Sequence, residues 1–206
     1  MSRISFRRRD GRRRSRRPLF FNRIVRDDRG VAAVEAAIIT PIFLLVVIGI
    51  IEFGLAFKDQ LAITSAVRAG ARMASAEPRT ATFATDAAAQ VARERGTIDM
   101  TQVQALWIYK ADPSGHPMNA GGSFNSCSTY CIHFAWDASS QSFVQSSGSW
   151  DVTAQNACQG SQDAVGVYLS FKHASVTQTF FDFLGMSSYT VMRFEPIPTL
   201  QQGGCK

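Results

Sequence analysis

Three histidines are the residues best suited to acid–base chemistry, and they lie far apart in the sequence, at His116, His133 and His173. Imidazole is the usual general base near neutral pH, and in a hydrolase it would activate a serine or cysteine nucleophile. The sequence has no nucleophile elbow, no pair of metal ligands on one helix and no phosphate-binding glycine loop. His133 falls within a strand pattern, where a structural role is expected. We therefore expect a protein that is not an enzyme, with no catalytic residue and no cofactor.

Four cysteines are the second group with chemical capacity: Cys127, Cys131, Cys158 and Cys205. An even number of cysteines in an oxidising compartment indicates disulfides, with three ways of pairing. Our first expectation is a bond between Cys131 and Cys158, which would stabilise the fold by about 3 to 4 kcal/mol in the chain-entropy model. A metal site built from Cys127, Cys131, His133 and Cys158 is the alternative, but structural zinc favours closer cysteine pairs. We expect disulfides and no metal, and Cys205 could stay free or bond another chain.

The third informative residue is Glu35, the fifth residue of the apolar run in "RGVAAVEAAIITPIFLLVVIGIIEFG" (29–54). The 16 residues from Ala36 to Ile51 carry no charge. The stretch from Val31 to Phe57 would be about 40 Å long as a helix, and a bilayer core is about 30 Å thick. We therefore predict a single transmembrane helix over 31–57, with Glu52 reaching the outer membrane surface. A buried helix of a soluble protein is the alternative interpretation.

The basic residues are concentrated before this segment. The first 29 residues contain 12 arginines and three aspartates, a net charge of +9, whereas the rest of the chain sums to −3. By the positive-inside rule, 1–30 should lie in the cytoplasm and 58–206 outside it. We expect the leader over 1–30 to be disordered and attracted to anionic lipid. Nucleic-acid binding, which a dense cationic segment also permits, is the weaker alternative.

Two export signals compete with a permanent membrane span. A secretory signal peptide needs a small-residue cleavage site directly after its apolar core. The first such sequence, Ala74-Ser75-Ala76, comes much too late in the chain. The segment "SRRPLF" (15–20) resembles a twin-arginine signal, but five charged residues separate it from the apolar run. Both signals are therefore less favoured than a permanent span.

The helical pattern continues beyond the predicted span. In "KDQLAITSAVRAGARMASAE" (58–77) apolar residues recur at intervals of three and four, and Pro78 is the first strong stop. We predict one helix from about Val31 to about Ser75, with a kink at Pro41, which removes one backbone hydrogen bond. A second amphipathic helix is predicted over 82–95, with Gly96 as its C-cap.

Four segments after Met100 are rich in β-branched and aromatic residues and predict strands, at 103–111, 130–136, 164–172 and 189–195. Long stretches rich in Ser, Gly, Asn and Gln separate them, especially 113–129 and 137–163. The predicted fold class is therefore α+β: a small antiparallel sheet with long loops that packs on the outer half of the long helix.

Several motifs between residues 29 and 75 occur together: Arg29-Gly30, Val34-Glu35, Pro41, Glu52-Phe53-Gly54 and Ala66-x-Arg68-Ala69-x-x-Arg72. In this combination they resemble the TadE-like family of Flp (Tad) pilus assembly proteins. The resemblance implies a membrane-anchored minor pilin or pseudopilin whose partners are other pilin-like subunits, the pilus assembly machinery and the lipid bilayer.

The same segment is similar to the processing site of type IV pilin-like proteins, because Glu35 is the fifth residue after Gly30. This resemblance implies that a prepilin peptidase cuts between Gly30 and Val31. The cut would remove all twelve N-terminal arginines and create an α-amino group one helical turn from Glu35. Glu35 could then pair with its own amine or with that of a neighbouring helix. In the alternative interpretation the chain stays uncut and Glu35 reaches the membrane interface beside Arg29.

We therefore expect a non-catalytic component of Flp pilus assembly in the cytoplasmic membrane. The alternative, from another class, is a single-pass anchored ectodomain that binds a cell-surface or cell-wall ligand and never enters a filament.

Overall fold

The computed structural model describes residues 28–96 and 98–197, which form two units: the first ends at Phe43 and the second begins at Leu44. The disorder predicted for the leader falls largely on residues 1–27, outside the described residues, as does Cys205 at the other end of the chain.

The predicted long helix is confirmed as α1 (Asp28–Ala76), which has 49 residues and contributes to both units. It begins before Val31, the predicted start, and ends one residue after the predicted end. Pro41 lies inside the helix. Because proline has no N–H group, the carbonyl group of Ala37 lacks its usual donor. The kink at Pro41 stays a prediction.

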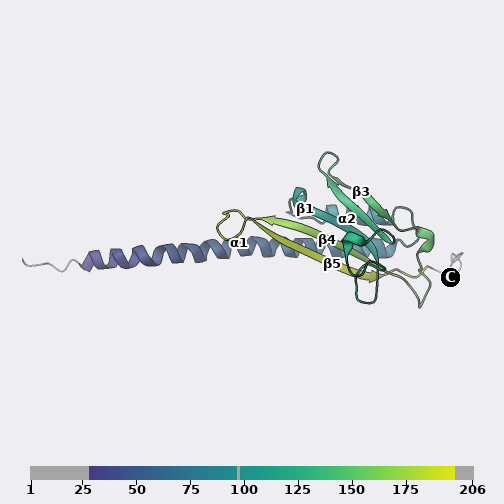
Figure 1. Ribbon diagram of the computed structural model, residues 1–206, viewed down its shortest axis with the longest axis horizontal. Coiled ribbons are helices and arrows are strands. Elements are labelled where there is room, and N and C mark those ends of the chain that lie inside the picture. The colour runs from purple at the N-terminus through teal and green to yellow at the C-terminus, as the bar shows by residue number, and fades with distance from the viewer. Residues whose placement is uncertain (1–27, 97, 198–206) are drawn as a thin grey trace, which may run out of the picture. The chain divides into compact units, whose positions relative to one another are not determined.

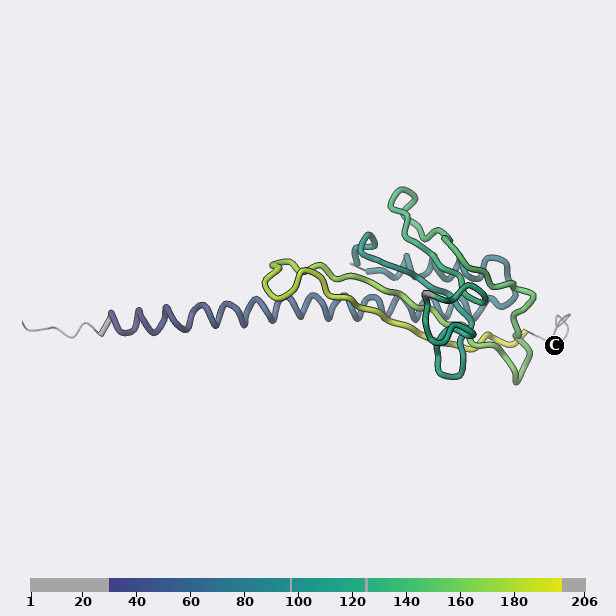
Figure 2. Tube along the Cα trace, viewed as in Figure 1, coloured from purple at the N-terminus to yellow at the C-terminus, as the bar shows by residue number. Residues whose placement is uncertain are grey.

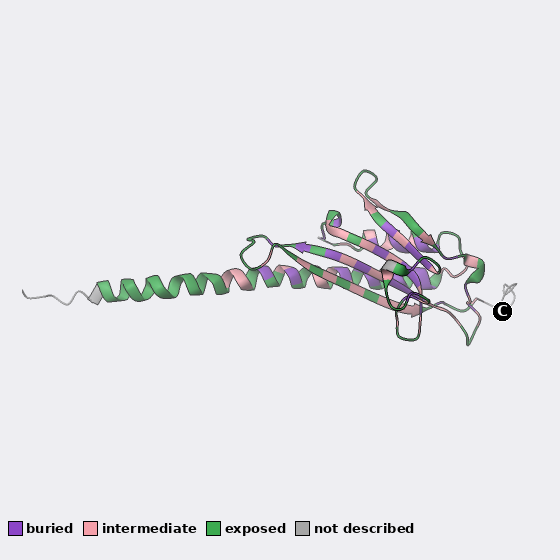
Figure 3. Ribbon diagram, in the orientation of Figure 1, coloured by how far each residue is buried: buried purple, intermediate pink, exposed green. Residues whose placement is uncertain are grey.

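In the first unit α1 is apolar and exposed on every side. All residues from Gly30 to Phe43 are exposed, and Val31 and Ile38 keep 60% and 62% of their surface accessible (Figure 3). The most apolar 18-residue window of the helix has a mean hydropathy of 2.6, and none of it is buried. By length and composition, α1 is the one helix among the described residues that could cross a membrane.

The second unit contains an antiparallel sheet of five strands (Figures 1 and 2). The strands are β1 (Val103–Ala111), β2 (Cys131–Asp137), β3 (Ser142–Ser149), β4 (Ala164–Ala174) and β5 (Phe183–Arg193). Their order across the sheet is β3-β2-β1-β4-β5. The helices other than α1 are α2 (Phe83–Arg93) and the short 3-10 helices η1 (Met100–Gln102), η2 (Phe124–Ser126) and η3 (Val152–Ala154). The predicted α+β class is confirmed.

Three of the four predicted strands are confirmed as β1, β2 and β4 within two residues at each end. The fourth, predicted over 189–195, is the later part of β5, which begins at Phe183. The prediction was wrong for 137–163, because β3 lies there. Its sequence, SFVQSSGS, has few apolar residues, and most of its side chains are exposed on an edge strand. Such a strand carries little hydrophobic alternation to be recognised.

One face of the sheet packs on both helices and forms the main core. Along β4, Val165, Val167, Leu169 and Phe171 are all at most 3% exposed. The helices contribute Ile63, Ala66, Val67, Ala71 and Ala74 from α1, and Phe83, Ala84, Ala87, Ala88 and Val91 from α2. The predicted packing of the sheet on the C-terminal half of the long helix is therefore confirmed.

The other face of the sheet is covered by the connection between β1 and β2 (112–130). Phe124 of this connection stacks on Tyr168 of β4, with ring centroids 4.1 Å apart, and meets Tyr109 of β1 edge-on at 5.2 Å. The Tyr109 hydroxyl donates a hydrogen bond of 2.9 Å to the carbonyl oxygen of Gly115. Gly166 makes room for this arrangement, because a Cβ there would overlap the Tyr109 ring.

The helices α1 and α2 approach each other closely at Gly70. A Cβ on Gly70 would overlap the Val91 side chain and lie 3.2 Å from the carbonyl oxygen of Ala87. Gly54 is a matched contrast on the same helix, because it is exposed and a Cβ there would meet no atom within 4 Å.

We predict that Gly70→Ala lowers the free energy of unfolding by about 1 to 3 kcal/mol, because steric overlap outweighs a gain of up to about 1 kcal/mol in helix propensity. Gly54→Ala gains the same propensity without overlap and should leave stability unchanged or slightly raised. Thermal unfolding of the full-length protein in detergent measures both. A Gly70→Ala protein as stable as the wild type would contradict the close helix contact.

Candidate functional site

The predicted processing site lies on the exposed part of α1 in the first unit. Gly30 and Val31 are both exposed, so the bond between them lies at the surface of the helix. A Cβ on Gly30 would meet no atom within 4 Å, and its φ is outside the left-handed region. The fold therefore gives no reason for a glycine at this position. A requirement for glycine would have to come from another molecule.

Glu35 lies one helical turn after Val31 and is exposed. Within the described parts of the chain it has no hydrogen bond and no ion pair. An ionised carboxylate without a partner is costly in lipid. After a cut between Gly30 and Val31, Val31 would be the first residue of the helix. The helix macrodipole favours a negative charge near such an N-terminus, and the α-amino group of Val31 would supply a cation four residues from Glu35. The structure thus places the two predicted residues on one side of α1, as the proposed pair requires.

The prediction for Glu52 was wrong. This side chain does not extend outward from the protein but is fully buried, with 0% of its surface exposed, under the turn between β4 and β5. Its two carboxylate oxygens accept hydrogen bonds from the backbone amides of Val176 (3.2 Å) and Thr177 (2.5 Å). Hydrogen bonds to a charged group are stronger than neutral ones. Glu52 therefore anchors this turn, which we call the β4–β5 turn (175–182), to α1.

Two further contacts hold the same hairpin along α1. The Phe53 ring packs against the rings of Phe180 and Phe181, with centroids 6.3 Å and 5.9 Å apart. Nearer the sheet, Nδ1 of His173 lies 2.8 Å from Oδ2 of Asp59, and both side chains are largely buried. Glu52, Phe53 and Asp59 lie within about two turns of α1. This part of the helix therefore holds the β4–β5 hairpin in place.

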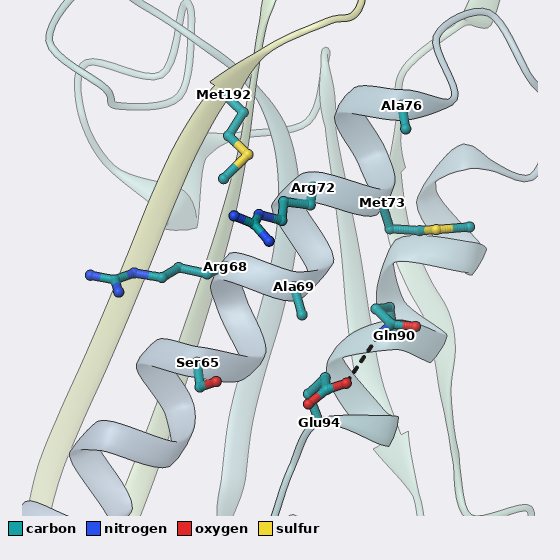
Figure 4. A pocket seen from close by; sticks show the side chains of 9 residues that line it. All are labelled: Ser65, Arg68, Ala69, Arg72, Met73, Ala76, Gln90, Glu94 and Met192. Atoms are coloured by element: carbon teal, nitrogen blue, oxygen red, sulfur yellow. Dashed lines mark hydrogen bonds between the residues drawn. The ribbon is translucent and has the colours of Figure 1, made fainter.

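A hollow of about 730 Å³ beside α1 brings together the two arginines of the recognised motif (Figure 4). Arg68 and Arg72 extend from α1 toward the side where Met192 lies on β5, whereas Gln90 lies on α2 and Glu94 directly follows it. Both arginines are exposed, and their guanidinium groups make no hydrogen bond or ion pair to any described residue. The Glu94 carboxylate accepts a hydrogen bond of 3.3 Å from Gln90. Two guanidinium groups four residues apart can bind carboxylates of another molecule.

Among the described residues, Asp, Ser and His side chains meet in a turn after β1. Ser114 Oγ donates to Asp112 Oδ1 at 2.6 Å and lies 3.1 Å from His116 Nδ1. The Asp112 carboxylate accepts from the backbone amide of His116 and not from its ring. Hydrogen bonds from Ser114 and from the His116 amide lower the pKa of Asp112. In a catalytic triad the carboxylate orients the imidazole ring. Here the Asp112 carboxylate bonds to the backbone of His116 instead, so its hydrogen bonds stabilise the turn.

His133 has the structural role predicted for it. Its ring packs on Trp107, with ring centroids 4.4 Å apart, and bonds through Nδ1 to the hydroxyl group of Ser146 on β3. Burial lowers the pKa of His133, because the charged imidazolium is poorly solvated there. In its neutral form His133 therefore links β2 to β1 through Trp107 and to β3 through Ser146.

The expectation of a disulfide is confirmed, but the expected pairing was wrong. Cys131 is bonded to Cys127, with Cα atoms 5.8 Å apart, and not to Cys158, which is itself disulfide-bonded. The small loop closed by this bond stabilises by about 2 kcal/mol in the chain-entropy model, less than the larger loop would. The bond also removes the two thiolates on which the alternative metal site with His133 depends.

Comparison with protein families matches residues 30–72 to the model described as TadE-like protein. This is the family that the sequence resembles, and the match covers the N-terminal segment of α1 together with most of its buried part. A TadE-like segment implies a component associated with Tad pili. Neither the curated proteins nor the solved structures include a match to the chain.

We predict that Glu52→Gln loosens the β4–β5 turn, because a neutral amide is a weaker acceptor than a carboxylate. Hydrogen exchange at the amides of Val176 and Thr177 should accelerate by about tenfold or more, which corresponds to about 1.4 kcal/mol. Glu35→Gln, which removes an exposed carboxylate on the same helix, is the control and should leave this exchange unchanged. Unaltered protection in Glu52→Gln would show that the turn is held without the carboxylate.

A pH dependence follows from the lowered pKa of His133. The unfolded chain binds a proton at this histidine near about pH 6.5, whereas the folded protein does so at lower pH. Between these two pKa values of His133, the unfolded chain holds more protons than the folded protein. The free energy of unfolding should therefore fall as the pH decreases through this range. Denaturant unfolding at about pH 7.5 and about pH 5.5 should show a smaller difference in His133→Gln than in the wild type. Equal differences in both proteins would show that folding does not lower the pKa of His133.

Proposed function

We propose that this chain is a minor pilin or pseudopilin-like component of Flp (Tad) pilus assembly, anchored in the cytoplasmic membrane by α1. The observation that carries the proposal is the TadE-like match to residues 30–72, because it coincides with the part of α1 that changes from exposed on every side to buried on one side. The role is structural rather than catalytic: the chain places a folded unit on a membrane helix that neighbouring subunits can contact.

The two parts of α1 support this role in different ways. From Gly30 to Val46 the helix is exposed and apolar, so it needs lipid or other apolar helices around it. From Glu52 to Ala76 one side of the same helix is buried by the sheet and α2. A helix that is half membrane segment and half domain core is what the resemblance to pilin-like proteins implies.

The charge distribution supports an orientation with the N-terminus in the cytoplasm. The first 29 residues carry a net charge of +9 directly before the apolar run. The disulfide between Cys127 and Cys131 lies in the second unit and fits an oxidising compartment outside the cytoplasm. In this orientation a prepilin peptidase would reach the Gly30–Val31 bond from the cytoplasmic face.

We predict that Gly30→Leu blocks cleavage in cells that express a prepilin peptidase, because the enzyme must accept the side chain before the scissile bond. The protein should stay heavier by the 30-residue leader, and N-terminal sequencing with intact-mass measurement detects this. Gly54→Leu is the control: this second exposed glycine of α1 also has open space around it, and its change should leave processing normal. A wild-type chain that still begins at Met1 would sink the cleavage proposal.

Glu35 can be tested apart from cleavage. Glu35→Gln keeps the size of the side chain and removes its charge, so membrane insertion should be retained or improved. If the carboxylate pairs with the α-amino group of a neighbouring helix, most cross-linking to other pilin-like subunits should be lost in this variant. Normal co-purification with the pilus machinery would contradict the pairing. Absence of any association in the wild type would favour the anchored ligand-binding ectodomain instead.

A further inference from the structure

The β4–β5 turn (175–182) presents large apolar side chains to the outside. Val176 and Phe180 keep 70% and 48% of their surface exposed, and Phe183, the first residue of β5, keeps 59%. The sequence from Val176 to Phe181 contains no charged residue, and the exposed Asp182 is the one charge of the turn. Clusters of exposed apolar residues on one short segment mark contacts with another molecule or with a membrane.

The same turn lies against the part of α1 that leads out of the predicted span. An atom of the Phe180 ring is 3.4 Å from the position that a Cβ on Gly49 would take, and the ring centroids of Phe180 and Phe53 are 6.3 Å apart. On α1 itself, Ile50 and Phe57 are 68% and 69% exposed. Exposed apolar residues of α1 and of the turn therefore lie on adjoining segments within the second unit.

Helix length puts this region at the outer edge of a bilayer. About 20 residues of helix rise about 30 Å, the thickness of a bilayer core. Counted from Val31, the first residue of the apolar run, such a segment ends at Ile50. Gly49 and Phe53 then lie where the hydrocarbon gives way to the headgroups, a layer in which aromatic and other apolar side chains of surface-bound segments are favoured.

Two local features fit a lipid environment at this level. The Glu52 carboxylate is shielded from lipid, because the turn covers it and donates two backbone hydrogen bonds to it. Beside the turn there is a hollow of about 130 Å³, lined by Phe53, Ala56, Phe57, Gln60, Leu184 and Met186. With the exception of Gln60, these side chains are apolar, so the hollow extends the apolar surface.

We propose that the β4–β5 turn is a second membrane contact, seated in the interfacial layer of the outer leaflet with Val176, Phe180 and Phe183 against the acyl chains. The inference rests on α1 crossing the membrane, as in the proposed function, but not on cleavage or on the pilus. Lipid fits better than a protein partner, because the exposed apolar surface of the turn continues that of the span. Together α1 and the turn fix the height and orientation of the second unit on the membrane.

The test uses the full-length protein in vesicles of phosphatidylcholine with a minor share of phosphatidylglycerol. Val176→Cys is labelled with an environment-sensitive nitrobenzoxadiazole dye without reductant, so that disulfide-bonded cysteines do not react. The hydrogen bonds to Glu52 come from the backbone amides of residues 176 and 177, so this side-chain substitution spares them. Lipids that carry a nitroxide near the headgroup should quench the dye severalfold more strongly than lipids with the nitroxide at the chain end. Phe183→Cys should give the same result.

Val144→Cys is the control, because Val144 is also an exposed valine, at 49%, but lies on β3, at the opposite edge of the sheet from β5. Its dye should be quenched little by either lipid, and unsubstituted protein gives the background labelling. Equal quenching at residues 144 and 176 would overturn the proposed contact, and so would absence of quenching at 176. Dye self-quenching at 176 that rises with protein density, without quenching by lipid, would instead show that a second copy covers the turn. A chain that urea extracts from the vesicles would overturn both the span and the turn contact, whereas failed processing alone would leave this inference standing.

Discussion

A buried carboxylate at the boundary between two environments constrains this molecule more than any other interaction. Glu52 would be costly in lipid as an ionised group, and costly in a protein core without donors. The amides of Val176 and Thr177 supply the donors, and they would themselves lack partners at the tip of a hairpin. These bonds form only if β4 and β5 run along α1 as far as this residue. The position of the sheet on the helix is thus set by Glu52 at one end and by the close helix contact at Gly70 at the other.

Local composition predicted most of the elements in this chain. The long helix, α2 and the strands β1, β2 and β4 follow from apolar periodicity and from β-branched and aromatic runs, because these elements bury a face. The edge strand β3 was missed for the opposite reason: its serines and glycine face water, so its sequence reads as a loop. The early part of β5, where Gly185 and two serines alternate with larger residues, gave a similarly weak signal.

The residues that act across long distances in the sequence could not be predicted in this way. Glu52 and Thr177 are 125 residues apart, and nothing in either segment indicates the other. The cysteine pairing failed for a related reason, because spacing alone does not show that 127–131 folds back into a short loop at the start of β2. Glu35 is different again: no described residue makes a hydrogen bond or an ion pair with its side chain, so its predicted role stays a prediction.

The motifs shared with TadE-like proteins divide into two groups by what this fold needs. Glu52 and Ala66 are buried, at 0% and 1% exposure, and each is explained by a contact within the second unit. Gly30, Glu35, Gly54, Arg68 and Arg72 are exposed and make no contact that requires their type. The fold does not explain why these residue types stand at these positions, so an explanation would have to come from contacts with other molecules. All five residues of the second group lie on α1.

The hairpin limits how those molecules can approach. At Gly49 and Phe53 one side of α1 is occupied by Phe180, so a neighbouring helix can contact the protein at this level only from the other sides. From Gly30 to Val46 every residue is exposed, and no described residue blocks an approach. Helix association in a membrane depends on close packing and on small or polar residues rather than on the hydrophobic effect. If the chain acts as proposed, association with neighbouring pilin-like helices would be favoured toward the Glu35 end of the predicted span, where the helix is exposed on every side and carries a charge that a partner can neutralise.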